Sequence, residues 1–267
     1  MARPILTQEH AAGDGKIFQI TINRPEVYNC INGEAAELLL EAWTKFRDDE
    51  SLTVAIMHGA GEKSFCSGAD LRALNELVNL NAGKEEMEKF VNAGTGPMGG
   101  TRIVQTKPVI TVSQGYTYAG GLELFCHGHI RLAEPQATFS VACRRWGVPL
   151  ADGGTVYLPR LVGNASALPL IITGQKIDAQ RAFAIGLVWE ITQQGNGLER
   201  AFQYARQICD QPRDALMADL ASAINGYPLS MDDALQLEAA RIYDVVRSES
   251  IQKGVAKFLS GNRGWFE

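Results

Sequence analysis

The sequence has little net charge and no long apolar run. Its 267 residues carry 25 Lys and Arg against 30 Asp and Glu, a formal charge of −5. The densest basic stretch is Arg144-Arg145, so a nucleic-acid-binding protein is not expected, because neutralising phosphates requires a basic stripe. No apolar run reaches the roughly 18 residues that cross a bilayer, so we expect no membrane partner.

Cysteine is scarce and unpatterned. The five cysteines are an odd number and have no repeated spacing, which predicts reduced thiols rather than a disulfide framework. Cys126-His127-Gly128-His129 has no fourth ligand at zinc spacing, so we predict no metal site and interpret both histidines as helix-end packing. Residues 1–16 lack the apolar segment of a signal peptide. We therefore expect a cytoplasmic protein, although some organelle matrices would give the same pattern.

What is present is the composition and patterning of a globular α/β protein. Hydrophobic residues make up 46% of the chain, which excludes intrinsic disorder. Strand patterns alternate with helical ones in the first two thirds of the chain, which indicates a parallel sheet. We predict strands at 17–23, 52–58, 109–112 and 131–133, a helix from about 32, and helices at 70–80 and 122–127. From about residue 198 only helices are expected, so we divide the chain into a core, 1–197, and a helical region, 198–267.

Two loops combine glycines with the start of a helix. The first is Ser64-Phe65-Cys66-Ser67-Gly68-Ala69-Asp70-Leu71, and the second runs from Gly115 to Leu124. A helix start has N–H groups without intrahelical partners, and two such starts together could hold one oxyanion. The alternative is that both loops are only tight turns between a strand and a helix.

Glu123 stands in the first turn of an otherwise apolar helix. Carboxylates are seldom fully buried without a partner, and burial raises their pKa toward neutrality. Such a group could transfer a proton near pH 7. The alternative is a glutamate that caps its own helix.

Further motifs follow one another along nearly the whole chain. They are Asn23-Arg24-Pro25-Glu26, the two glycine-containing loops, Gly147 to Thr155 (GVPLADGGT), Leu158 to Gly163 (LPRLVG) and Gly254 to Leu259 (GVAKFL). Each motif is weak alone. In this number and order they resemble the crotonase (enoyl-CoA hydratase/isomerase) superfamily.

The resemblance implies a fold, a substrate and a set of site residues. The fold would be a spiral of ββα units, with a C-terminal helical region that drives trimers or hexamers. The substrate would be a coenzyme A thioester, so coenzyme A enters with the substrate and no separate cofactor is expected. The thioester carbonyl would lie between the N–H groups of Ala69 and Gly120. The residues expected to contact the substrate are Gly68, Asp70, Leu71, Cys143 and Trp146.

The sequence departs from the family pattern at the position of a second catalytic residue. Hydratases of the family use two glutamates; the first matches Glu123, but the second falls on Cys143. Asp152, just before Gly153-Gly154, is the candidate substitute acid/base, with a helix N-cap as the alternative.

The reaction therefore stays open within the family. We expect an enoyl-CoA hydratase-like lyase. The alternatives are an enoyl-CoA isomerase, a hydrolase that breaks C–C bonds in β-diketones, and a non-catalytic acyl-CoA-binding subunit. Arg144 and Arg145 could bind an acidic acyl group or form structural ion pairs.

Overall fold

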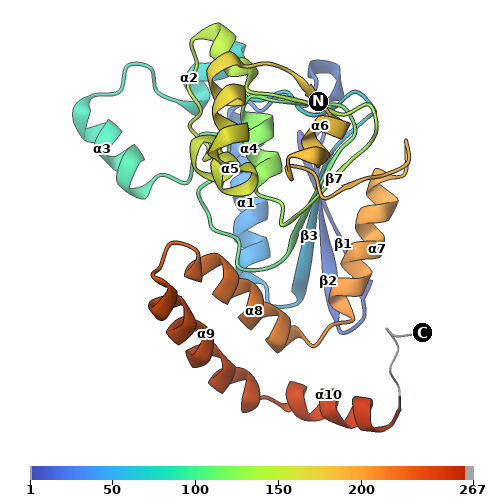
Figure 1. The fold of residues 1–267 in the computed structure, drawn as a ribbon. Coiled ribbons are helices and arrows are strands. Elements are labelled where there is room, and N and C mark those ends of the chain that lie inside the picture. Colours follow the sequence, from blue (N-terminus) through green and yellow to red (C-terminus); the bar gives the residue numbers. More distant parts are fainter. Residues whose placement is uncertain (1, 262–267) are drawn as a thin grey trace.

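A six-stranded sheet forms the centre of the molecule. The structure, a computed structural model, describes residues 2–261 (Figure 1). The strand order is β1-β2-β3-β5-β7-β10, in which β1 and β2 are antiparallel and all other neighbours are parallel. The strands are β1 (Ile5–Ala12), β2 (Gly15–Ile22), β3 (Leu52–Gly59), β5 (Val109–Ser113), β7 (Ile130–Ala133) and β10 (Glu190–Ile191).

A smaller sheet of four short strands lies beside the first. Its order is β4-β6-β8-β9. The strands are β4 (Ser64–Cys66), β6 (Tyr116–Tyr118), β8 (Thr138–Ser140) and β9 (Ile177–Asp178). The chain passes three times from a strand of the large sheet to one of the small sheet and then into helical structure. This repetition confirms the expected α/β spiral of ββα units.

Helices cover both faces of the large sheet (Figure 1). α1 (Gly33–Asp48) and α4 (Gly120–Cys126) pack on one face, and α7 (Gly197–Cys209) packs on the other. Seven of the eight residues of β3 are buried. Coverage on both sides explains why this strand has a continuous apolar sequence rather than an alternating one.

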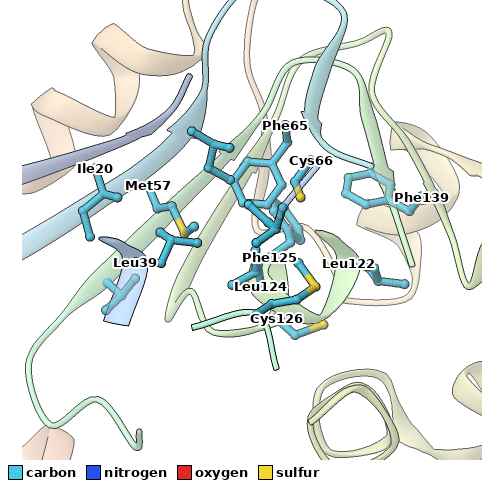
Figure 2. Close-up of a cluster of buried hydrophobic side chains, with 14 of the residues drawn as sticks. Ile20, Leu39, Met57, Phe65, Cys66, Leu122, Leu124, Phe125, Cys126 and Phe139 are labelled. Carbon is cyan, nitrogen blue, oxygen red and sulfur yellow. The ribbon is translucent and has the colours of Figure 1, made fainter. Parts of the chain in front are cut away.

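α4 lies between the two sheets and is buried over its whole length. The ring of Phe125 packs 5.8 Å from that of Phe65 in β4 and 5.1 Å from that of Phe139 in β8 (Figure 2). The helix approaches β4 so closely that a Cβ atom on Gly121 would overlap the carbonyl of Cys66. The second glycine-containing loop is therefore fixed by packing as well as by sequence.

The remaining helices follow the sheets in the chain. They are the 3₁₀ helices η1 (Pro25–Val27), η2 (Leu71–Ala73) and η3 (Ala142–Trp146), and the α-helices α2 (Leu74–Leu77), α3 (Lys84–Ala93), α5 (Gly154–Thr173), α6 (Ala179–Ala184), α8 (Arg213–Gly226), α9 (Met231–Val246) and α10 (Glu249–Leu259). Among residues 2–261, α5 is the one helix whose length and apolar composition would allow it to cross a membrane. Its backbone leaves helical geometry at Gly163.

The helical region predicted from residue 198 contains two kinds of helix. α7 packs against the large sheet, whereas α8, α9 and α10 pack on one another and extend away from the sheet (Figure 1). Residues 262–267 of that region lie outside the described residues, as does residue 1 of the predicted core.

One local prediction was wrong, and one strand was missed. The helix expected over 70–80 is instead η2 followed by α2, because Val78 is extended and ends the helical stretch. The sequence also gave no sign of β1, whose side chains are mostly exposed and polar because it forms one edge of the large sheet.

We predict that Gly121→Ala destabilises the protein by about 1–3 kcal/mol, because the added methyl group meets the backbone of β4. Chemical denaturation monitored by circular dichroism would measure the change. Gly254→Ala is the matched control, since a Cβ atom at this position in α10 meets nothing within 4 Å. Equal stability of the Gly121→Ala and Gly254→Ala variants would contradict the close packing of α4.

Candidate active site

A cavity of about 210 Å³ opens beside the N-terminus of α4. Its walls come from both glycine-containing loops, from η2 and α2, and from the segment that leads into α5. They are mainly apolar. The lining residues are Ser67, Ala69, Leu71, Leu74, Leu77, Val78, Pro97, Met98, Tyr118, Ala119, Gly120, Glu123, Ala142, Cys143, Trp146, Val148, Pro149, Ala151 and Asp152.

Glu123 is the buried carboxylate of this cavity, with 2% of its surface exposed. Its Oε2 accepts hydrogen bonds from the backbone N–H of Asp152 at 2.9 Å and of Gly154 at 2.6 Å. Burial, and secondly the negative charge of Asp152, raise the pKa of Glu123 to about 7, although these N–H groups act in the opposite direction. A carboxyl group with this pKa can both accept and donate a proton at neutral pH.

The two glycine-containing loops meet at the cavity. A Cβ atom on Gly68 would lie 2.9 Å from Cβ of Ala119 and 3.0 Å from the backbone nitrogen of Gly120. Ala69 and Gly120 both line the cavity, and neither backbone N–H has an acceptor among residues 2–261. Two unpaired backbone donors therefore lie in the same cavity as Glu123.

The backbone at Ala119 is strained. Its φ is 51° and its ψ is −124°, a conformation that residues with a side chain seldom adopt. A hydrogen bond of 2.8 Å from its N–H to the carbonyl of Ser140 helps to hold it. This residue forms the turn that starts α4, so the strain fixes the direction in which the chain enters Gly120.

Asp152 lies in the cavity wall beside Glu123 and is 4% exposed. It is not the N-cap of α5; that position is Gly153, and no side chain caps it. The Oδ1 atom of Asp152 instead accepts hydrogen bonds from the backbone N–H of Met98, at 3.0 Å, and from the hydroxyl of Thr101. Burial raises the pKa of Asp152, and these two hydrogen bonds partly offset it.

Cys143 and Trp146, from η3, also reach the cavity. The Cys143 side chain is buried, and burial, together with the charge of Glu123, raises the pKa of its thiol. The thiol is therefore neutral and does not replace a carboxylate. Trp146 is 70% exposed and stands at the rim. Arg144 and Arg145 are exposed and do not line the cavity, and no ion pair is formed by either among residues 2–261.

Not all of the residues expected to contact substrate lie at the cavity surface. Leu71 does, but the carboxylate of Asp70 pairs with Arg24 at 3.2 Å and accepts a hydrogen bond from the N–H of Arg72. Asp70 thus holds the first loop in place. Gly68 does not line the cavity; its contribution to the site is the close approach of its backbone to Gly120.

His127 and His129 pack at the end of α4. The ring of His127 lies 5.0 Å from that of Tyr157, and Nδ1 of His129 accepts a hydrogen bond of 3.0 Å from the N–H of Val109. Burial lowers the pKa of both side chains to about 4. Within the described part of the chain no cluster of three or more His, Cys, Asp or Glu side chains could hold a metal ion.

Some residues of the site gave no signal in the sequence. Met98 and Thr101 belong to the irregular segment between α3 and β5, where no periodicity or motif marks them. A row of tyrosine rings was also missed: Tyr28 lies 5.8 Å from Tyr116, which lies 5.2 Å from Tyr118 at the cavity. The alternation of Tyr116 and Tyr118 on one strand was the only available sign that these two share a face.

Comparison with known proteins agrees with this geometry. The family model described as enoyl-CoA hydratase/isomerase matches residues 12–266. A crotonyl-CoA hydratase of Syntrophomonas wolfei is 30% identical over 253 residues, 94% of each chain, and a short-chain-enoyl-CoA hydratase of Clostridium acetobutylicum is 29% identical over 246 residues, 92% of each. The solved structure of an enoyl-CoA hydratase from Mycobacterium tuberculosis superposes with a TM-score of 0.84 at 27% identity, covering 97% of this chain and 96% of that one. The chain therefore belongs to the enoyl-CoA hydratase/isomerase family of acyl-CoA-processing, crotonase-fold enzymes.

Proposed function

We propose that this protein hydrates an enoyl-CoA, with Glu123 as the general acid/base and the N–H groups of Ala69 and Gly120 as the oxyanion hole. One observation carries the proposal: a buried carboxyl group with a pKa of about 7 shares an apolar cavity with two unpaired backbone N–H donors. The names of the relatives support the same reaction class.

In this mechanism the Glu123 carboxylate takes a proton from a water molecule. The water oxygen bonds to the β-carbon of the enoyl group, and the electron pair of the double bond moves toward the thioester oxygen. The N–H groups of Ala69 and Gly120 hold the resulting enolate oxygen, in which the negative charge develops. Glu123 then returns its proton to the α-carbon, so the elements of water are added and the enzyme is restored.

The row of Tyr28, Tyr116 and Tyr118 supports a place for the rest of coenzyme A. Tyr28 and Tyr116 are 46% and 42% exposed, so their adjacent rings offer an accessible aromatic surface next to the cavity. Lys63 is exposed beside them, and its carbonyl accepts a hydrogen bond from the N–H of Tyr116. We infer that the pantetheine arm and nucleotide of coenzyme A leave the cavity along this row.

Ordinary hydration in this family uses a second acid/base, and neither candidate residue here holds water as a free glutamate would. Cys143 is neutral, and Asp152 has one carboxylate oxygen already engaged by two donors. Water would thus be held less firmly than between two free glutamates, and a small misplacement can reduce the rate about 10²-fold. We therefore propose weak hydration of straight-chain enoyl-CoA thioesters, with Asp152 as the candidate second acid/base.

We predict that Glu123→Gln lowers turnover of crotonyl-CoA by about 10²-fold or more and leaves ligand affinity nearly unchanged, because the amide keeps the shape but not the proton transfer. Hydration is followed by the loss of enoyl thioester absorbance, and affinity by calorimetry with a saturated acyl-CoA. Wild-type turnover in the folded variant would remove Glu123 from the mechanism.

The same assay separates the alternatives. Cys143→Glu, which restores a second glutamate, should hydrate crotonyl-CoA faster than wild type. A folded Cys143→Glu variant without any gain would show that the second acid/base position is misplaced. Turnover of a cyclic β-diketone or double-bond migration, without hydration, would assign one of the other enzyme classes. Tight acyl-CoA binding with no turnover of any substrate would indicate a binding subunit.

Burial of Glu123 also predicts a pH-dependent stability difference. The pKa of Glu123 is about 7 in the folded protein against 4.5 for an ordinary Glu, so folding favours the protonated form. The contribution of Glu123 to the free energy of unfolding is at its full value below pH 4.5 and is lost as the pH rises through 7. Glu123→Gln removes that loss and should stabilise the protein by about 3 kcal/mol at pH 8.

Denaturation curves of wild type and Glu123→Gln at pH 4.5 and pH 8 measure this difference. The gain should nearly vanish at pH 4.5. Glu62→Gln, a substitution at an exposed position, is the matched control and should change stability little at either pH. A gain from Glu123→Gln that is independent of pH would contradict the raised pKa.

We also propose that the chain forms a homotrimer or a dimer of trimers. Leu216, Leu220 and Ile224 of α8 are half-buried within the chain, whereas five large apolar side chains of α9 are exposed. These exposed side chains are Met231, Leu235, Ile242, Tyr243 and Val246. Large apolar side chains exposed in this number on one helix call for a covering surface, and the family resemblance makes that surface a second copy of the chain.

We predict a mass of three or six chains by light scattering at micromolar concentration. Leu235→Asp, which places a charge on the exposed face of α9, should shift the distribution toward single chains. A monomeric wild-type protein would contradict the proposed assembly.

A further inference from the structure

We propose that Thr101 is a positioning residue of the active site: its hydroxyl fixes the Asp152 carboxylate, and through Asp152 it sets the orientation and charge environment of Glu123. The inference deepens the proposed function, on which its kinetic consequences rest. It assigns a role to a segment that no sequence motif marks.

The first step is the contact between Thr101 and Asp152. Thr101 is completely buried, and its hydroxyl donates to Oδ1 of Asp152, the same oxygen that accepts from the N–H of Met98. Gly96, with a φ of 96°, lets the chain turn tightly here; a Cβ atom on it would overlap the Thr101 hydroxyl and lie 3.2 Å from Oδ1 of Asp152. The turn is thus built around this carboxylate, which lies 51 residues away from Thr101 in the chain.

The second step connects Asp152 to Glu123. The backbone N–H of Asp152 donates to Oε2 of Glu123 at 2.9 Å, so a displacement of Asp152 moves a donor of the catalytic carboxylate. Met98, held by the same Asp152 oxygen, has its side chain against Gly120, where it limits the space beside the proposed oxyanion donor. Asp152 therefore connects the segment 96–101 to Glu123 and to the proposed oxyanion donor at Gly120.

The third step is electrostatic. The charge of Asp152 is the second cause, after burial, of the raised pKa of Glu123, and the hydrogen bond from Thr101 is the main influence that lowers the pKa of Asp152 itself. Without the Thr101 hydroxyl, Asp152 would hold a proton more readily. A protonated Asp152 no longer repels the charge of Glu123, so the pKa of Glu123 would fall.

Other ionisable groups face this pair but do not replace the Thr101 contact. Arg102, whose guanidinium bonds to the carbonyls of Phe90 and Ala151, lowers the pKa of Asp152 less than Thr101 does. Cys66, Cys126 and Cys143 are buried thiols with raised pKa values, and His127, whose pKa is lowered by burial, is neutral at pH 7. Asp152 is consequently the ionisable group beside Glu123 whose charge the Thr101 hydroxyl influences.

The test is a direct titration of Glu123 by infrared spectroscopy, with Glu123→Gln used to assign its carboxyl band. The wild-type midpoint should lie near 7. Thr101→Val should lower the midpoint by about one pH unit, and Thr101→Ser, which restores the hydroxyl, should return it. Asp152→Asn should lower it likewise, and Thr101→Val should add no further shift in the Asp152→Asn background.

Thr106→Val is the matched control, because it makes the same substitution at an exposed position in the same segment. Circular dichroism checks folding, and Thr101→Ala replaces Thr101→Val if the valine variant does not fold. An unchanged or raised midpoint in the folded variants that lack the hydroxyl would overturn the proposal, as would shifts that add in the double variant.

A kinetic readout separates this inference from the proposed function. With an active enzyme, the pH of half-maximal kcat/KM should move with the infrared midpoint, while KM changes little. If wild type hydrates no enoyl-CoA, the proposed function fails, yet the infrared titration still decides the role of Thr101.

Discussion

The carboxylate of Glu123, enclosed in an apolar wall, is the constraint on which the rest of the site depends. Ionising a buried carboxyl group is unfavourable unless donors compensate for the water it has lost. The backbone N–H groups of Asp152 and Gly154 supply that compensation, and they can do so only if the chain enters α5 as it does. The pKa of about 7 is a balance between burial and the Asp152 charge on one side and these donors on the other.

Close packing around α4 gives this balance a fixed geometry. Gly68 and Gly121 allow the two loops and β4 to approach within distances that side chains would forbid, and Gly120 leaves room for the side chain of Met98. The strained backbone of Ala119 is held because its neighbours are immobilised by the aromatic contacts of Phe125 with two strands of the smaller sheet, β4 and β8 (Figure 2). The N–H of Gly120 is unpaired because this residue begins α4, and the packing around the helix holds that N–H in place.

The sequence predicted those parts of the molecule that depend on local patterns. The strand at 17–23 was visible from its alternating side chains, and the strands at 52–58 and 109–112 and the helix around Glu123 were visible as short apolar runs, because burial selects apolar residues. The two glycine-containing loops and Asp152 were visible as motifs, and the structure brings them into one cavity.

What the sequence did not predict depends on contacts between distant residues. Thr101 and Asp152 are 51 positions apart, and nothing in the irregular segment around Thr101 indicates its partner. Asp70 follows the first glycine-containing loop, yet its carboxylate turns to Arg24, 46 positions away, rather than to the cavity. Asp152 and Asp70 were both visible in sequence motifs, but the direction of each side chain and its partner were decided by tertiary packing.

The number of carboxylates in the cavity offers a reason why position 143 is a cysteine rather than a glutamate. Two carboxyl groups, Glu123 and Asp152, already share a site of low polarity, and each makes ionisation of the other less favourable. A third carboxylate at position 143 would raise these pKa values further unless a new donor or cation accompanied it, and among residues 2–261 no Lys or Arg lines the cavity. The neutral thiol of Cys143 adds no negative charge to this pair, so the gain in hydration expected from Cys143→Glu carries an electrostatic cost. Asp152 is therefore the second carboxyl group of this cavity, and its position on a different segment brings it into contact with Thr101.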